Sequence, residues 1–273
     1  MEMTTIAAGT AVIGTNDQQI DWLVAHTKWA AKWVEKDFFR REQPQHEVHV
    51  DSFSIGVHPV TVAQYRAFVD AGGYENGSHW TVDGRLWQET NKVTKPAYWG
   101  DKLWTGDPRL PVAGVSWYEA VAFCRWMGEV LGKDCRLPTE VEWEKAAGGG
   151  DGRIYPWGDR FESQKCNTRA AGVNHTLPVG SCSPEGDSPY GCWEMIGNVS
   201  EWVLNKFATY PYLSGDGREE LEGTAERVTR GGSWQSPEFR ARISARGMNV
   251  PSFQDNDLGF RIVSSAADRE AGK

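Results

Sequence analysis

Residues 191–202, GCWEMIGNVSEW, fit neither a regular helix nor a regular strand. Large apolar residues are interrupted by two glycines and Asn198, and two carboxylates, Glu194 and Glu201, stand seven positions apart. Gly and Asn tolerate backbone angles that other residues avoid, so we expect the chain to fold back here and bring carboxylate and carbonyl oxygens together. Such a group of oxygens suits a hard cation such as calcium. The alternative is a buried aromatic turn whose acids face solvent or pair with arginine.

The composition favours a globular fold with large loops. The 273 residues include 14 Trp, 30 Gly and 13 Pro, which suggests a core of large rings connected by turns. The net charge of -8 disfavours a surface that follows phosphates, so no nucleic acid is expected as a partner. No segment approaches the roughly 20 apolar residues of a membrane span, and residues 1–10 lack the features of a signal peptide.

The five cysteines are odd in number and never occur as C-x-x-C. A disulfide scaffold and a zinc site are therefore both poorly supported. We expect a cytoplasmic protein with reduced thiols.

Helix signals are clear at three places. Ser116 with Glu119 and Thr139 with Glu142 form capping boxes, and each predicts the start of a helix. Thr61 begins a third predicted helix, which ends at two glycines at 72–73. Residues 74–109 show no clean period and are expected to form long ordered loops.

Short strands are expected in four places, at 5–14, 46–55, 228–234 and 258–263. In the second of these, Val48 and Val50 should share a face. Residues 16–41 place Trp22, Trp29 and Trp33 on one helical face. This segment is expected to pack on its own domain or to dock a partner.

Seven short motifs occur in an order that resembles the formylglycine-generating enzyme, or sulfatase-modifying factor, superfamily. They are PVT at 59–61, GVSW at 114–117, RLPTEVEWE at 136–144, YPWG at 155–158, GNVSEW at 197–202, RGGSW at 230–234 and GFR at 259–261. The resemblance implies an α+β, C-type-lectin-like fold with small twisted, mostly antiparallel sheets, two main helices and many loops. The expected organisation is one domain over residues 1–273, with an added helical segment at about 16–41.

The resemblance also implies bound structural calcium. Carried over to this chain, one site would use Glu194, Gly197, Val199 and Glu201. Members of the superfamily often have Asn or Asp where this chain has Glu194. A second site would begin at Asn167 and Thr168, but its other ligands fall where this chain has a shorter loop, at 171–174.

Catalytic members of the superfamily bind copper through two cysteines that follow the GGS-aromatic motif. Residues 235–246 contain no Cys, and a hydroxyl such as that of Ser236 cannot replace a thiolate as a Cu(I) ligand. We therefore expect no copper, no catalytic residues for formylglycine generation and no such activity. The competing hypothesis is a metal-dependent oxidase or sulfoxide synthase acting on a thiol. Its iron-binding relatives use histidines, yet the early histidines here show no H-x-x-x-H spacing.

A third branch that resembles this superfamily, the variable proteins of diversity-generating retroelements, displays recognition residues between the two final motifs. The corresponding segment here mixes aromatic, basic and amide side chains, which make good recognition anchors. We therefore predict a domain that binds an unknown protein or small-molecule ligand through this segment. The alternative for Arg242 and Arg246 is that they pair with acids. The candidate residues are Trp234, Gln235, Ser236, Glu238, Phe239, Arg240, Arg242, Ser244, Arg246, Met248, Asn249, Ser252, Phe253, Gln254 and Asn256.

Overall fold

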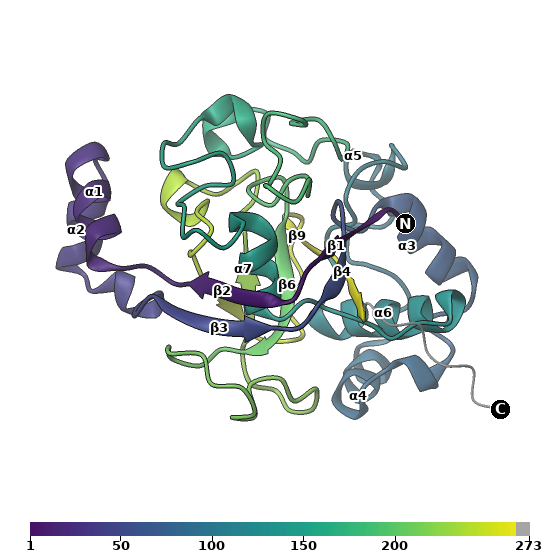
Figure 1. Ribbon diagram of the computed structural model, residues 1–273. Helices are drawn as coiled ribbons and strands as arrows, with labels where there is room; N and C mark the ends of the chain where they lie inside the picture. Colours follow the sequence, from purple (N-terminus) through teal and green to yellow (C-terminus); the bar gives the residue numbers. More distant parts are fainter. Residues whose placement is uncertain (266–273) are drawn as a thin grey trace.

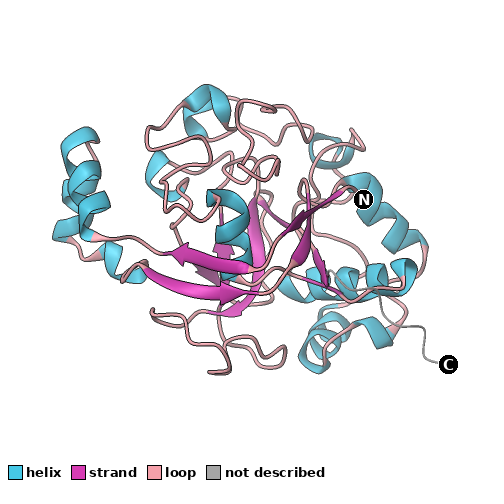
Figure 2. Ribbon diagram, viewed as in Figure 1, coloured by secondary structure: helices cyan, strands magenta, loops and turns pink. Residues whose placement is uncertain are grey.

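The computed structural model describes residues 1–265, and its strands form three small sheets (Figures 1 and 2). The first sheet is antiparallel and has the order β1 (Met3–Ile6), β4 (Phe53–Gly56), β10 (Val263–Ser265) and β5 (Cys135–Arg136). The second pairs β2 (Gly9–Ile13) with β3 (His46–Val50). The third has the order β8 (Gly247–Asn249), β7 (Arg227–Arg230), β6 (Ser200–Lys206) and β9 (Leu258–Phe260), and only its β6–β9 pair is parallel.

The helices pack around these sheets. The two main helices, α6 (Trp117–Leu131) and α7 (Glu140–Gly148), begin at the predicted capping boxes, in which each cap side chain and each third-residue glutamate satisfy backbone N–H groups reciprocally. The predicted helix at Thr61 is α3 (Val62–Asp70), and it also starts with a capping box. The α+β fold with mostly antiparallel sheets and large loops is therefore confirmed.

Several expected boundaries differ. Residues 46–55 form two strands, since β3 and β4 belong to different sheets. Residues 74–109, predicted as loops, contain α4 (Val82–Asn91) and α5 (Lys102–Thr105), because Thr81 and Asp101 cap helix starts whose apolar spacing is irregular. The last part of the 191–202 stretch is strand, since β6 begins at Ser200.

The added helical segment is broken into α1 (Asp17–His26), α2 (Ala30–Glu35) and the 3-10 turn η1 (Phe38–Arg41). Figure 1 shows α1 and α2 at the end of the molecule opposite α3, α4 and α6. Trp29, Phe39 and Leu23 form a small core there with Tyr155. This arrangement leaves α2 and η1 beside the last part of the chain.

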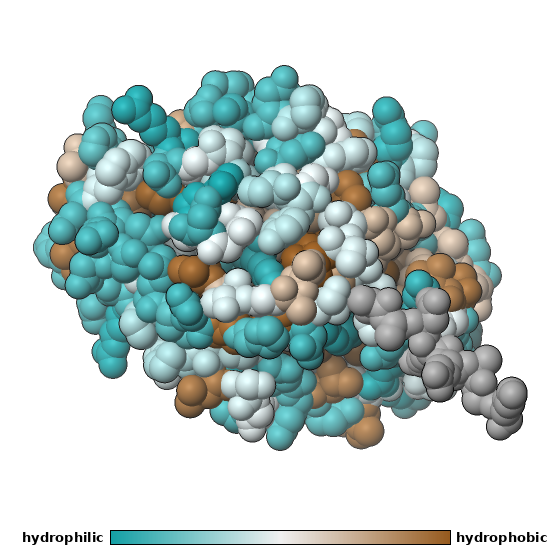
Figure 3. All heavy atoms as spheres, in the orientation of Figure 1, coloured by the Kyte–Doolittle hydropathy of each residue, from teal (hydrophilic) through white to brown (hydrophobic). Residues whose placement is uncertain are grey.

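The main core consists of large rings. Trp117, Trp143 and Trp202 are fully buried, and together they connect α6, α7 and β6. The face visible in Figure 3 is mostly hydrophilic, with apolar side chains in small groups. Within residues 1–265, no helix is long and apolar enough to cross a membrane.

Candidate functional site

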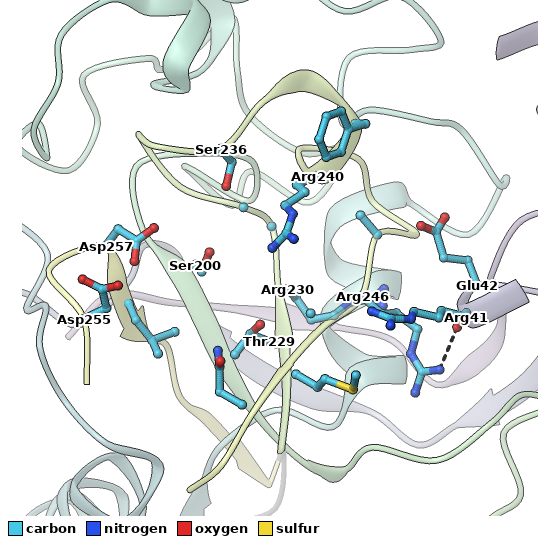
Figure 4. A pocket seen from close by; sticks show the side chains of 18 of the residues that line it. Arg41, Glu42, Ser200, Thr229, Arg230, Ser236, Arg240, Arg246, Asp255 and Asp257 are labelled. Atoms are coloured by element: carbon cyan, nitrogen blue, oxygen red, sulfur yellow. Dashed lines mark hydrogen bonds between the residues drawn. The ribbon is translucent and has the colours of Figure 1, made fainter. Parts of the chain in front are cut away.

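A cavity of about 640 Å³ lies between the helical segment and the final third of the chain. One wall comes from α2, η1 and the residue after η1; the other comes from β7, the 231–246 loop, β8 and the turn before β9. Figure 4 shows Arg240, Arg41, Ser236, Asp255 and Asp257 around this space. The helical segment, whose role the sequence left undecided, thus packs on its own domain and walls a cavity.

Arg242 holds the two walls together. Its guanidinium makes a two-point ion pair with Glu42, at 2.8 and 2.7 Å. The same guanidinium lies 5.2, 5.5 and 5.3 Å from the ring centroids of Trp29, Trp33 and Phe39, which is cation–π distance. Because Arg242 and Glu42 are almost completely buried, this pair replaces hydration with contacts from both segments.

Arg246 makes a second anchor. It donates to both carboxylate oxygens of Glu140 at 2.9 and 3.0 Å, and to the carbonyl oxygen of Arg41 at 2.8 Å. Its guanidinium also lies 4.1 Å from the Tyr210 ring centroid. Pairing with acids, the alternative for Arg242 and Arg246, is therefore what the structure shows.

The predicted recognition residues divide into two sets. Those that line the cavity are Ser236, Phe239, Arg240, Arg246, Met248, Asn249 and Phe253. Those that do not line it are Trp234, Gln235, Glu238, Arg242, Ser244, Ser252, Gln254 and Asn256. Several of the second set bond within the protein: Ser244 with Glu42, Gln254 with Glu119, and Gln235 with Asn256.

The opposite wall and the acidic residues before β9 are not among the residues predicted from the sequence. Trp33, Phe38 and Arg41 line the cavity from the helical segment, and Asp255 and Asp257 line it from the other side. The aromatic helical face at 22–33 is the one sequence signal for the wall formed by Trp33, Phe38 and Arg41. It does not indicate which other segment this wall faces. Nothing local in the sequence indicates that residues 33–42 meet residues 229–258.

Two arginines in the cavity are unpaired. Arg41 and Arg240 are exposed, and no carboxylate of residues 1–265 lies within ion-pair distance of either guanidinium. No cation of the described chain lies within ion-pair distance of Asp255 or Asp257, although Arg240 is near enough to act on Asp257 electrostatically; Asp257 also accepts a hydrogen bond from the Ser233 hydroxyl. Burial raises the pKa of Asp257 above its ordinary value.

None of the described residues that line the cavity is a cysteine. Ser236, which follows the GGS-aromatic motif, lines the cavity, and its oxygen accepts a hydrogen bond from the Ser233 N–H at 2.9 Å. Burial raises the thiol pKa of Cys166 to about 12 and that of Cys182 to about 11. Without a metal these two thiols therefore remain largely protonated near neutral pH.

The 191–202 stretch folds back as predicted. Gly197 and Asn198 have φ of 82° and 62°, and Glu194 also adopts a left-handed conformation with φ of 47°. At the kink, the Gly197 N–H donates a hydrogen bond to the Gly231 carbonyl at 3.1 Å. The Asn198 carbonyl accepts one from the Trp234 N–H, also at 3.1 Å. The stretch therefore sets the position from which the cavity loop departs.

Glu201 is committed to an ion pair inside this stretch. Arg261 donates to both Glu201 oxygens at 2.7 Å, and the Trp143 indole donates to one of them at 2.8 Å. The same guanidinium reaches the Trp193 carbonyl at 2.9 Å. Both Glu201 oxygens are thus already engaged by the protein, while Gly197 and Val199 would contribute backbone carbonyl oxygens, a donor type that calcium takes.

The remaining expected calcium ligands fit better. One carboxylate oxygen of Glu194, the amide oxygen of Asn167 and the hydroxyl of Thr168 are buried and have no hydrogen-bond partner in the described chain. Asn167 packs against the kink, since its carbonyl accepts from the Asn198 N–H at 2.7 Å. Burial raises the pKa of Glu194 to about 7. Carboxylate, amide and hydroxyl oxygens are the donor types that calcium takes.

The histidines are spread over the molecule. His46 accepts from the Tyr212 N–H at 2.7 Å, His79 lies 3.0 Å from Glu129, and His58 stacks on Trp193. In the part of the chain that the structure describes, no three His, Cys, Asp or Glu side chains are grouped so that they could hold one metal ion.

Comparisons with known proteins agree with this fold. The family model described as the sulfatase-modifying factor enzyme 1-like domain matches residues 1–266. The mouse inactive C-alpha-formylglycine-generating enzyme 2 is 33% identical over 263 residues, covering 82% of this chain and 79% of the mouse protein. The formylglycine-generating enzyme of Streptomyces coelicolor is 33% identical over 273 residues, covering 82% of each chain. The hercynine oxygenase of Mycolicibacterium smegmatis is 34% identical over 244 residues, and the match covers 81% of this chain but only 55% of that protein.

Solved structures show the same architecture. PvdO from Pseudomonas aeruginosa superimposes with a TM-score of 0.71 at 24% identity, covering 96% of this chain and 94% of PvdO. Treponema denticola variable protein 1 gives a TM-score of 0.66 at 22% identity, with the same coverage of 96% and 94%. At these identities the likeness concerns the fold, whereas the named relatives include both inactive and active members. From the family model and the relatives together, the chain belongs to the sulfatase-modifying factor enzyme 1-like, or formylglycine-generating enzyme, family.

Proposed function

We propose that this protein is a ligand-binding member of the family that does not generate formylglycine. The observation that supports it is the cavity itself, which has a ligand-sized volume of about 640 Å³ and no cysteine among its lining residues. Its wall combines aromatic side chains with unpaired charged groups, the mixture expected where a ligand is both buried and oriented.

Substitutions at two adjacent residues test the cavity. Asn249 lines it, whereas its neighbour Val250 is 48% exposed and lies outside it. A thermal-shift screen should first find compounds that raise the Tm of the parent protein. Asn249→Tyr should fill the cavity, so these compounds should no longer raise the Tm. Val250→Tyr, the matched control, should keep that stabilisation. Equal stabilisation of both variants would place binding elsewhere.

A direct assay tests the missing activity. Protein loaded with Cu(I) and then dialysed should retain no stoichiometric copper, and a cysteine-containing peptide should consume no oxygen in its presence. Stoichiometric copper or iron with oxygen-dependent thiol loss would instead support the competing function, a metal-dependent oxidase or sulfoxide synthase. The positions of the histidines favour the binding function over that alternative.

The division of the 235–256 segment also sharpens the retroelement hypothesis. If the segment is diversified, variation between sibling loci should fall at cavity residues such as Phe239, Arg240, Met248 and Asn249. The anchors Arg242 and Arg246 should stay constant, because each pairs with a buried acid. Sequencing these loci decides the matter: identical segments without a nearby template repeat would contradict it.

We also propose a structural calcium ion, held by Glu194 with Asn167 and Thr168 and without Glu201. Calcium added to chelator-treated protein should raise its Tm, because an ion that binds only the folded state stabilises it. Glu194→Gln should remove this response, and Glu185→Gln, a change at an exposed glutamate of the same region, should preserve it. A calcium response that survives Glu194→Gln would contradict this ligand set.

A further inference from the structure

The charged groups lining the cavity divide into paired and unpaired ones. Arg230 pairs with Glu144, Arg246 with Glu140, and Glu42 with Arg242, so these groups are already neutralised by the protein. Four charges remain: the guanidiniums of Arg41 and Arg240 and the carboxylates of Asp255 and Asp257.

The unpaired charges are separated by sign. In Figure 4, Asp255 and Asp257 lie together at one side of the cavity, Arg41 extends from the opposite side, and Arg240 points into the space between them. Arg240 comes from the turn η5 (Glu238–Arg240) and Arg41 from η1, while both acids come from the segment that precedes β9. The cavity therefore has an anionic side at Asp255 and Asp257, a cationic side at Arg41, and the Arg240 guanidinium between them.

Apolar side chains occupy the rest of the wall. Trp33, Phe239 and Met248 line the cavity, and the rings of Trp33 and Phe239 lie 5.0 Å apart. Phe38 and Phe253 also line the cavity and are 40% and 39% exposed, so their rings are accessible to a ligand. A ligand with an apolar part between two charged ends would complement all three surfaces.

We propose that the cavity takes a small zwitterion. Its anionic group, a carboxylate or a phosphonate-like group, binds Arg240 and Arg41, its cationic nitrogen binds Asp255 and Asp257, and its apolar part lies against Phe239 and Met248. This inference rests on the proposed ligand-binding function and names the chemical class of the ligand.

Calorimetric titration with matched compounds tests the class. The probes are amino acids and dipeptides with aromatic or aliphatic side chains, each compared with its N-acetyl derivative, its C-terminal amide and the doubly blocked neutral form; aminophosphonates distinguish the two anionic groups. At least one zwitterion should bind, and removing either charge should weaken binding about ten- to hundredfold, because each loses a charge-assisted hydrogen bond.

Two variants assign the charges to their residues. Arg240→Gln should weaken binding of the free zwitterion about tenfold or more and leave the affinity of its amide unchanged. Asp255→Asn should weaken the zwitterion similarly and leave the N-acetyl form unchanged. Both side chains are at the surface of the cavity, and an unchanged Tm would show that the variants fold.

The outcomes separate this inference from the proposed function. If the neutral or singly charged forms bind as tightly as the zwitterions, the class is wrong and ligand binding stands. If no zwitterion binds while Asn249→Tyr blocks another compound, the class is again wrong. If no compound stabilises the parent protein at all, both the zwitterion class and the ligand-binding function are wrong.

Discussion

Residues 193–202 and residues 235–257 are both irregular and rich in interactions of charged groups, yet they place those groups differently. In the first segment Glu201 is completely buried and bound by Arg261, which comes from beyond β9. In the second, buried anchors such as Arg242 alternate with side chains such as Arg240 that reach the cavity. The first segment has no charged group left for an outside partner except the Glu194 carboxylate, whereas the second keeps several.

This difference indicates that the first segment positions the loop and the second carries the residues of the cavity. The kink at Gly197 and Asn198 bonds to Gly231 and Trp234 and so fixes the start of the loop. The anchors at 242 and 246 fix its middle. Between these points the loop can change its cavity residues with little effect on the fold, since those side chains make few internal bonds.

The largest effect that we predict concerns the buried pair in the first segment. Arg261→Met leaves the Glu201 carboxylate buried without its cation, and should lower the free energy of unfolding by about 3–5 kcal/mol. Arg240→Met, the matched change in the cavity, should alter it by no more than about 0.5 kcal/mol. Urea denaturation measures both, and equal losses would remove the distinction between the two segments.

The anchor at Arg242 should rank next. Arg242→Met leaves the buried Glu42 carboxylate without its cation and removes the guanidinium from the Trp29, Trp33 and Phe39 rings. It should lower the free energy of unfolding by about 3 kcal/mol. The cost stays at the lower end of the range because the helical segment can detach and let water reach Glu42. Limited proteolysis should then cut within residues 16–41 while the core resists. Uniform cleavage along the chain would show instead that the segment does not detach separately.

A third effect depends on pH. Burial raises the pKa of Glu119 to about 7 from an ordinary 4.5, so the folded state binds a proton that the unfolded state has released between these values. Stability should therefore fall as the pH rises from 5 to 7, by about 2 kcal/mol for this group. Glu119→Gln should remove that share of the pH dependence of unfolding. An unchanged slope would mean that Glu119 is ionised in the folded protein.

The smallest effect should come from Ser236. Its hydroxyl bonds to the Ser233 N–H, so Ser236→Ala should cost about 1 kcal/mol of stability. Binding of a cavity ligand should weaken little, as expected for a residue that shapes the loop. A complete loss of binding with an unchanged Tm would show direct contact between Ser236 and the ligand.

Much of the fold could be predicted from local signals. The caps at Thr61, Ser116 and Thr139 act within one helical turn, and the ordered motifs indicated the family. Helix α4 was missed because its apolar residues Val82 and Leu86 are exposed, so the sequence lacks a clean buried face.

The site was only half predictable for a different reason. The segment after Trp234 was identified through family resemblance, but which of its side chains face the cavity depends on Glu42 and Glu140, acids that are distant in sequence. Polar and aromatic residue types alone could not separate Arg240 from Arg242. Nothing in the sequence of residues 33–42, which form the opposite wall, indicates that they pack against residues 229–258.

The pair between Glu42 and Arg242 joins residues separated by 200 positions. Closing a loop of that length costs conformational entropy, which the contacts between its ends must offset. While the chain is being synthesised, residues 16–42 leave the ribosome long before their partner exists, with the rings of Trp29, Trp33 and Phe39 still uncovered. Both walls of the cavity must therefore have been synthesised before the cavity can form.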